Sequence, residues 1–97
     1  MTLSTHVLDA TTGTPAAGMT VVLRTDGRER DRLVTDADGR GRFADPGAGV
    51  HTLTFATADW SSFYPEVTVA FTVTDPQRHH HVPLLLSPFA YSTYRGS

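Results

Sequence analysis

Apolar and polar residues alternate most regularly over residues 66–74, where small polar or alanine side chains separate four apolar ones. The period of two residues places all four on one face of an extended strand, and Val and Phe favour strands. This segment is therefore predicted to be a strand with one face in the core and the other in solvent. The apolar members are Val67, Val69, Phe71 and Val73.

Shorter runs of the same character recur along the chain and are also predicted to be strands. Pro83, which lies in the fourth run, cannot donate a hydrogen bond to a neighbouring strand, and this indicates a sheet edge or a bulge there. The last two runs flank Ser87-Pro88, which suggests a closing pair of strands. The predicted runs are residues 2–8, 20–25, 51–55, 82–86 and 89–94.

Turn-forming residues separate these runs at short, fairly regular intervals. They are Thr12-Gly13-Thr14-Pro15, Asp26-Gly27, Asp38-Gly39, Asp45-Pro46-Gly47, Asp75-Pro76 and Ser87-Pro88. Many short strands are typical of an all-β sandwich, here of seven or eight strands. One short helix is expected over residues 58–63, capped by Thr57 or Asp59, and the charged residues 28–32 are expected to form a loop at the rim.

Composition indicates a single globular domain over residues 1–97. Apolar residues make up 39% of the chain and charged residues 19%, which is sufficient for a packed core. A chain of 97 residues buries a limited share of its surface, so association with further copies would stabilise it. The formal net charge of −2 argues against nucleic-acid binding. Without a basic and apolar leader or a run near the ~20 residues of a membrane span, a cytoplasmic protein with no membrane partner is expected.

Five histidines are the most unusual chemical feature, and the chain contains no cysteine. Imidazole can act as a base or as a metal ligand near neutral pH. In an extended His79-His80-His81, alternation places His79 and His81 on one face and His80 on the other. A metal site completed by His6 or Asp9 is one alternative, although the spacing matches no strong zinc pattern, and an exposed run without function is another. Histidine chemistry without a metal or a cofactor is the preferred interpretation.

Two residues nearer the N-terminus have both an ordinary and a functional interpretation. His6 lies within a predicted strand, where a half-buried histidine bonded to backbone is the ordinary case. Arg40 follows Asp38-Gly39, a turn whose glycine accepts a positive φ, so Arg40 begins the next strand. A surface arginine paired with a neighbouring aspartate is ordinary as well, and such a pair contributes under about 1 kcal/mol.

The C-terminal residues 91–97 are rich in aromatic and polar side chains and end directly after the last predicted strand. A short tail after the last strand is the ordinary interpretation. In the functional interpretation the tail is fixed at a site. It would then bring the Tyr94 hydroxyl, the Arg95 guanidinium and the Ser97 hydroxyl with the terminal carboxylate within reach of a ligand.

Six segments in order resemble the motifs of the 5-hydroxyisourate hydrolases, which are relatives of transthyretin. The resemblance spans essentially the whole chain, and six motifs with matching spacing are far more specific than any one of them. The segments are Ser4-Thr5-His6-Val7-Leu8-Asp9, Gly13-Thr14-Pro15-Ala16, Asp38-Gly39-Arg40, Phe63-Tyr64-Pro65-Glu66-Val67, His81-Val82-Pro83-Leu84-Leu85-Leu86-Ser87-Pro88 and Tyr94-Arg95-Gly96-Ser97.

The resemblance implies a prealbumin-like fold, in which two four-stranded sheets form a Greek-key sandwich with a short helix after the fifth strand. It also implies a homotetramer, a dimer of dimers with its active sites at the dimer–dimer interface. His80 departs from the family pattern, which usually has an aromatic residue between the paired histidines. Transthyretin lacks these histidines and the final tetrapeptide, so the enzyme is favoured over the carrier. The residues that match the family's site are His6, Arg40, His81, Tyr94, Arg95, Gly96 and Ser97.

The implied reaction opens the ring of 5-hydroxyisourate at an acyl C–N bond and yields 2-oxo-4-hydroxy-4-carboxy-5-ureidoimidazoline. One imidazole would activate water, and the other would orient the water or protonate the leaving nitrogen. Arg40 would bind substrate carbonyls, stabilise the charge that grows on them and lower the pKa of a nearby imidazole. The expected catalytic residues are His6, Arg40, His81 and Ser97. The residues expected to bind substrate are His6, Arg40, Tyr94, Arg95 and Gly96.

Three other function classes are compatible with the sequence. A transthyretin-like module would bind a small ligand saturably without consuming it. A β-sandwich adhesion or spacer domain would normally belong to a longer secreted chain. A histidine-metal protein would carry stoichiometric zinc or copper after mild purification.

Overall fold

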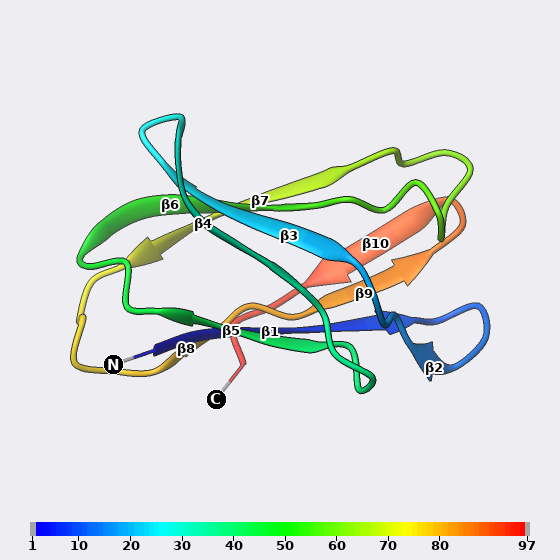
Figure 1. Cartoon of the computed structure of the whole chain (residues 1–97), viewed down its shortest axis with the longest axis horizontal. Helices are drawn as coiled ribbons and strands as arrows, with labels where there is room; N and C mark the ends of the chain where they lie inside the picture. The colour runs from blue at the N-terminus through cyan, green and yellow to red at the C-terminus, as the bar shows by residue number, and fades with distance from the viewer. Residues whose placement is uncertain (1, 97) are drawn as a thin grey trace.

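The computed structural model describes residues 2–96, which form two β-sheets packed against each other (Figure 1). One sheet has four strands in the order β4-β3-β6-β7, all antiparallel to their neighbours. Its strands are β3 (Thr20–Thr25), β4 (Arg28–Val34), β6 (Gly49–Phe55) and β7 (Val67–Val73).

The second sheet is organised around β1 (Thr2–Asp9). On one side β1 pairs with β5 and β2, and on the other it runs parallel to β8 and β9, with β10 following β9 at the edge. This arrangement confirms the all-β sandwich. The remaining strands are β2 (Thr14–Pro15), β5 (Arg40–Ala44), β8 (His80–His81), β9 (Leu84–Ser87) and β10 (Ala90–Thr93).

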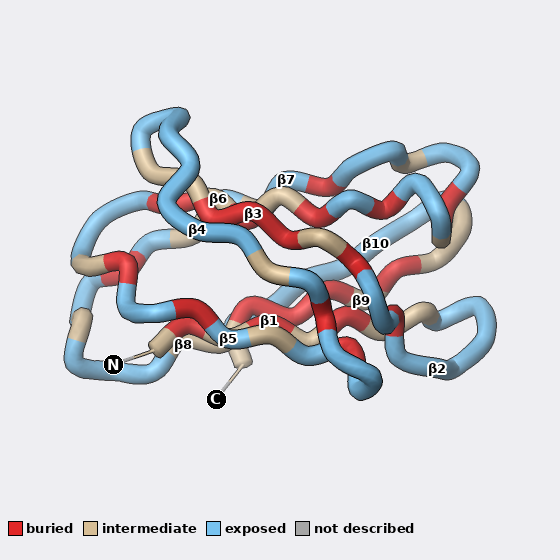
Figure 2. Tube along the Cα trace, viewed as in Figure 1, coloured by how far each residue is buried: buried red, intermediate tan, exposed pale blue. Residues whose placement is uncertain are grey.

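The core lies between the sheets and follows the predicted alternation of apolar and polar residues (Figure 2). Val67 and Val73 are buried and Val69 and Phe71 partly buried, while the residues between them are exposed, as the pattern over residues 66–74 predicts. Burying apolar surface from both sheets stabilises the sandwich at about 25 cal/mol per Å². The fully buried apolar residues of the core are Leu3, Val7, Ala16, Met19, Val21, Leu53, Phe55, Leu84 and Leu86.

Residues 28–32, expected to form a loop, instead lie within β4. Asp26 and Gly27 have φ angles of 53° and 76°, which is the geometry of a tight two-residue hairpin turn between β3 and β4. Because β4 pairs only with β3, it forms a sheet edge, and most of its side chains are exposed. Charged residues suit such an edge, since they discourage pairing with other chains. The prediction of a loop was wrong because it took charge as a sign against a strand.

The short helix expected over residues 58–63 is also absent, and turns occupy this segment. The Ser61 N–H donates to the Thr57 carbonyl at 3.0 Å, which closes a single helical turn. The Ser61 hydroxyl oxygen then accepts the N–H groups of Phe63 at 3.2 Å and Tyr64 at 3.0 Å. A helix would need those donors for its own carbonyls, so the side chain ends the turn.

Pro83 interrupts the last part of the second sheet, between β8 and β9. The interruption lies inside the sheet rather than at its edge, because β9 has β1 on one side and β10 on the other. Strands β9 and β10 flank Ser87-Pro88-Phe89 and pair antiparallel, which confirms the predicted closing pair. No helix among residues 2–96 is long and apolar enough to cross a membrane.

Candidate active site

Alternation along β1 separates a buried face from an outer face that carries polar side chains. Leu3, Thr5 and Val7 are buried, whereas Ser4 and His6, which alternate with them, are partly exposed. Successive side chains of a strand point to opposite sides of the sheet. Ser4 and His6 therefore lie together on the side facing away from the core.

Neighbouring strands bring further polar side chains to this outer face. In the ladder between β1 and β5, His6 lies opposite Arg40 and Ser4 opposite Arg42. In the parallel pair with β8, Ser4 lies beside His81. Side chains at paired positions share a face of the sheet. The register thus gathers two guanidinium groups and two imidazoles in one place.

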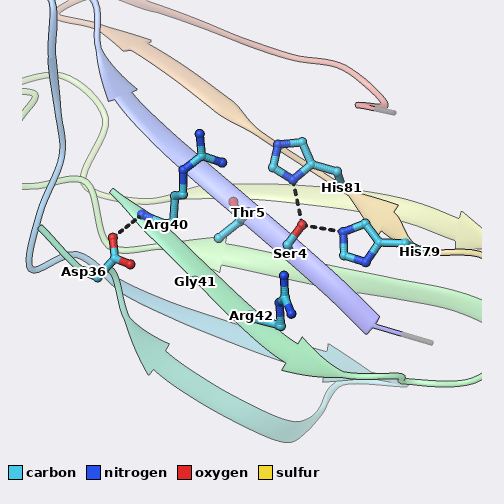
Figure 3. A pocket seen from close by; sticks show the side chains of 8 residues that line it. All are labelled: Ser4, Thr5, Asp36, Arg40, Gly41, Arg42, His79 and His81. Carbon is cyan, nitrogen blue, oxygen red and sulfur yellow. Dashed lines mark hydrogen bonds between the residues drawn. The ribbon is translucent and has the colours of Figure 1, made fainter. Parts of the chain in front are cut away.

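A polar pocket of about 420 Å³ opens on this face, and it contains both Arg40 and His81 (Figure 3). Positive groups dominate its charged lining, since the lining includes two arginines, Arg40 and Arg42, and one carboxylate, that of Asp36. A pocket of this character suits a small polar or anionic ligand. The lining residues are Ser4, Thr5, Asp36, Arg40, Gly41, Arg42, His79 and His81.

The turn before β5 holds Arg40 at the pocket. A carboxylate oxygen of Asp36 accepts the backbone N–H groups of Asp38 and Arg40, both at 2.9 Å. Gly39 has a φ of 76° and donates its N–H to the Asp36 carbonyl at 2.9 Å. A β-carbon at Gly39 would also press against the Val7 carbonyl oxygen, so glycine is required for two reasons. The predicted role of this glycine is confirmed.

His81 is partly buried between the sheet and the C-terminal tail. Its Nδ1 is 2.8 Å from the Ser4 hydroxyl oxygen. Burial lowers the pKa of His81 from 6.5, and the positive charges of Arg40, His6 and His79 lower it further, while a hydrogen bond to the Ser4 backbone opposes them. Neutral imidazole is therefore favoured at this position. The expected repulsion from Arg40 is present, but burial is the larger cause.

His6 lies beside this group rather than in the lining of the polar pocket. Its Nε2 is 2.9 Å from the Asp38 carbonyl oxygen, which can only accept, so Nε2 carries a proton. In neutral His6 the other nitrogen, Nδ1, is then free to accept a hydrogen bond. The bond to backbone is the one expected of a structural histidine, and it also fixes the tautomer of a reactive one.

The C-terminal tail reaches the other side of His81. The Gly96 N–H donates to the His81 carbonyl at 2.9 Å, and a β-carbon on Gly96 would collide with the His81 ring. Tyr94 and Arg95 are exposed and line a second, more apolar pocket of about 310 Å³ that also contacts His81. His81 therefore separates the two pockets. Ser97, the last expected site residue, lies outside the described residues.

Several lining residues were missed by the sequence analysis. Ser4, Asp36 and Arg42 carry no motif of their own, and they join the pocket only through strand register and turn geometry. His79 was correctly placed on the same face as His81, since both rings bond to the Ser4 hydroxyl. His80 instead bonds the Arg78 carbonyl at 3.0 Å.

Within residues 2–96, no three histidine or carboxylate side chains are grouped closely enough to hold a metal ion.

Comparisons with known proteins agree on one family. The model of the HIUase/Transthyretin family matches residues 3–96. The 5-hydroxyisourate hydrolase of Caulobacter vibrioides is 43% identical over 98% of this chain and 97% of that protein. The corresponding hydrolase of Deinococcus radiodurans is 42% identical over 98% of this chain and 95% of that protein.

Solved structures show the same relationship. The 5-hydroxyisourate hydrolase of Klebsiella pneumoniae is 42% identical, covers all of both chains and superposes with a TM-score of 0.90. Sea bream transthyretin in complex with thyroxine is 30% identical over 97% of this chain and 93% of that chain, with a TM-score of 0.79. A 5-hydroxyisourate hydrolase and a thyroxine-bound transthyretin therefore share this fold.

Proposed function

Because this chain belongs to the HIUase/Transthyretin family, we propose that it hydrolyses 5-hydroxyisourate to 2-oxo-4-hydroxy-4-carboxy-5-ureidoimidazoline in urate breakdown. The observation that carries the proposal is the shared pocket of Arg40 and His81 on the outer face of the β1 sheet. A guanidinium and a neutral imidazole are the two groups that water attack on a ring carbonyl requires. A carrier needs neither, so this pocket favours the enzyme.

His81 acts as the general base: it takes a proton from the attacking water, and the protonated ring returns this proton to the leaving nitrogen as the acyl C–N bond breaks. Its lowered pKa keeps the imidazole neutral at neutral pH, and Nδ1 is bonded to Ser4, which leaves Nε2 for the attacking water. His6 orients this water through its free Nδ1, since its Nε2 is bonded to the Asp38 carbonyl. The two histidines therefore have different tasks because their hydrogen-bond partners differ.

Arg40 binds the carbonyl that water attacks and stabilises the negative charge that grows on its oxygen. A guanidinium offers several donors in a fixed plane, and its charge remains at all working pH values. The Asp36 carboxylate holds the Arg40 backbone rather than its side chain. No ion pair of the Arg40 side chain occurs within residues 2–96, which leaves the guanidinium free for substrate.

The tail completes the site in this proposal. Tyr94 and Arg95 hydrogen-bond the substrate from the second pocket, on the other side of His81 from Arg40, and Gly96 holds the tail against His81. The role of Ser97 stays a prediction. The reaction needs no cofactor in this scheme.

We further propose a homotetramer, a dimer of dimers with its sites at the dimer–dimer interface. Strands β7 and β10 both lie at sheet edges, where a second copy can extend the sheets. All of β10 is exposed, and Phe63 and Phe89 expose 63% and 72% of their surface. A partner that covers the outer face of the β1 sheet would close the polar pocket and exclude bulk water from it. The cytoplasmic location stays a prediction.

A coupled assay tests the function. Urate oxidase generates 5-hydroxyisourate from urate in situ, and its ultraviolet decay is followed with and without the protein, in the presence of a chelator. The native chain should accelerate the decay. His81→Ala should lower kcat by roughly two to four orders of magnitude, the range for a positioned general base. His80→Ala is the comparison variant, since His80 lines the second pocket and not the polar pocket that holds Arg40, so its loss of kcat should be much smaller than that of His81→Ala.

Two outcomes would overturn the proposal. A folded native oligomer without any acceleration would favour a small-ligand binding module, and saturable binding without consumption would then be measured. Acceleration that His81→Ala retains in full would remove this histidine from the mechanism. Activity that the chelator abolishes would favour the metal alternative.

A further inference from the structure

A chain of hydrogen bonds connects His81 to a residue that the proposed mechanism does not use. The Ser4 hydroxyl oxygen is 2.8 Å from His81 Nδ1 and 2.8 Å from His79 Nε2 (Figure 3). On its far side, His79 Nδ1 is 2.5 Å from the Thr2 hydroxyl oxygen. His79 is therefore bonded at both ring nitrogens, whereas His81 is bonded at Nδ1. The order of groups is Thr2, His79, Ser4 and His81.

Proton counting restricts how this network can be arranged. A serine hydroxyl has one proton to donate and can also accept. With both imidazoles neutral, Ser4 donates to one ring and accepts an N–H from the other. In the first arrangement, Ser4 donates its proton to His79 Nε2 and accepts the Nδ1–H of His81. In the second arrangement, Ser4 donates its proton to His81 Nδ1 and accepts the Nε2–H of His79. The two arrangements put the mobile proton of His81 on different nitrogens.

Arg40 decides between them. The second ring nitrogen of His81, Nε2, lies on the side of the Arg40 guanidinium (Figure 3), and the charge of Arg40 lowers the pKa of His81. A positive charge favours the bare nitrogen facing it and disfavours an N–H in that place. Arg40 thus favours the arrangement in which His81 carries its proton on Nδ1. Ser4 then accepts from His81 and donates to His79.

We propose that His79 is a positioning residue, which accepts the Ser4 proton and thereby holds His81 with its proton on Nδ1 and its Nε2 bare. Without an acceptor at position 79, the Ser4 hydroxyl is free to donate to His81 Nδ1, which moves the proton to Nε2. A histidine with Nε2–H cannot take a proton from water at that atom. The catalytic consequence rests on the proposed function, whereas the tautomer itself does not.

Nitrogen NMR provides the direct test, because the ring nitrogens of neutral histidine give different shifts when bare and when protonated. In the native protein, above the titration of His81, Nδ1 should be protonated and Nε2 bare. In His79→Ala and in Ser4→Ala the population with Nε2–H should rise. His79→Gln should largely restore the native tautomer, since its side-chain oxygen can accept the Ser4 proton.

Kinetics provide a second readout. His79→Ala and Ser4→Ala should lower kcat about tenfold or more with little change in KM, as expected when part of a general base contribution of about 10²–10⁴ is lost. The double variant should lose no more than either single variant, because both act by one route. His79→Gln should recover most of the native kcat. His80→Gln is the matched control for the tautomer, since His80 bonds the Arg78 carbonyl and not Ser4, and it should leave the His81 tautomer unchanged.

The proposal would be overturned by native His81 protonated on Nε2, or by a tautomer that His79→Ala and Ser4→Ala leave unchanged. Losses that add in the double variant, or a His79→Gln variant as slow as His79→Ala, would also overturn it. A protein without hydrolase activity that still shows the tautomer shift on substitution would reject the proposed function alone. The experiments therefore distinguish failure of the His79 proposal from failure of the proposed hydrolase function.

Discussion

Single side chains decide the protonation state of the candidate site. His6 and His81 are both partly exposed histidines on one sheet face, yet one bonds a carbonyl through Nε2 and the other a hydroxyl through Nδ1. Each partner leaves the opposite ring nitrogen for chemistry. The chemistry of this site therefore depends on which ring nitrogen of each histidine is hydrogen-bonded to the protein, more than on the number of histidines.

The pH dependence of activity should follow His81. A base works in its neutral form, so a lowered pKa extends activity to lower pH, and kcat should fall only as pH drops through a value below 6.5. In Arg40→Met the repulsion is removed, and the His81 pKa measured by NMR should rise toward 6.5. An unchanged pKa in that variant would show that Arg40 does not face the ring.

Gly96→Ala should damage the site without unfolding the chain. The added β-carbon would collide with the His81 ring, so either the ring or the tail must move. We expect kcat to fall by about tenfold or more while the far-UV spectrum stays native, because a displaced base loses much of its contribution of about 10²–10⁴. Native turnover would mean that the tail does not need its close approach to His81.

At the scale of elements, the turn before β5 determines where the guanidinium lies. Asp36 and Gly39 form a compact loop through backbone bonds, and β5 starts at Arg40 directly after it. The strand then places Arg40 opposite His6. Any change that loosens this turn should affect binding before it affects the core.

Gly39→Ala tests that link. The φ of 76° costs a residue with a side chain about 1–2 kcal/mol, and contact with the Val7 carbonyl adds to this. We expect a lower free energy of unfolding by urea denaturation and a raised KM. Gly27→Ala is a matched control, since Gly27 has the same φ but open space around it, and it lies in the turn between β3 and β4 of the other sheet, outside the lining of the polar pocket. It should lose stability without a change in KM.

Sequence predicted the elements that bury a regular apolar face and missed those whose identity depends on neighbours. The strand over residues 66–74 was evident because alternation records burial, whereas β4 was missed because an edge strand can be charged throughout. Residues 58–63 were predicted to form a helix, but in the structure the Ser61 hydroxyl oxygen accepts two backbone N–H groups that a helix would need. The presence of a serine at position 61 does not by itself predict these hydrogen bonds.

The residues of the candidate site also fall into those that the sequence predicts and those that it does not. His6, Arg40 and His81 could be predicted because a family resemblance marks them, and alternation alone placed His79 with His81. Ser4 and Arg42 could not, since their place in the pocket depends on which residue of one strand faces which residue of another. Register between distant strands is set by the whole fold.

At the scale of the whole molecule, exposed aromatic rings are consistent with the proposed assembly of several copies. Phe63 and Phe89 are in ring contact at 6.3 Å and are both largely exposed. Adjacent exposed apolar rings are unfavourable in water and are typical of surfaces that another chain covers. In the proposed assembly, a second copy would also cover the open polar pocket.

Phe63→Ser combined with Phe89→Ser should weaken assembly. Replacing two exposed rings removes apolar area from the proposed interface while leaving the core residues unchanged. Sedimentation velocity should show smaller species at low micromolar concentration, and specific activity should rise with protein concentration. Val34→Ser and Val50→Ser, also at exposed apolar positions, are the matched comparison. Equal assembly of all variants would place the interface elsewhere.

The parallel contact between β1 and β8 joins the two ends of the sequence. Ser4 and His79 are 75 positions apart, and the tail that contacts His81 comes later still. Contacts between such distant segments form slowly, because a long loop must close first. During synthesis β1 can pair early with β2 and β5, but its parallel partners β8 and β9 begin at His80 and leave the ribosome much later. Its apolar face stays exposed in that interval, which makes the nascent chain a client for chaperones that bind apolar strands.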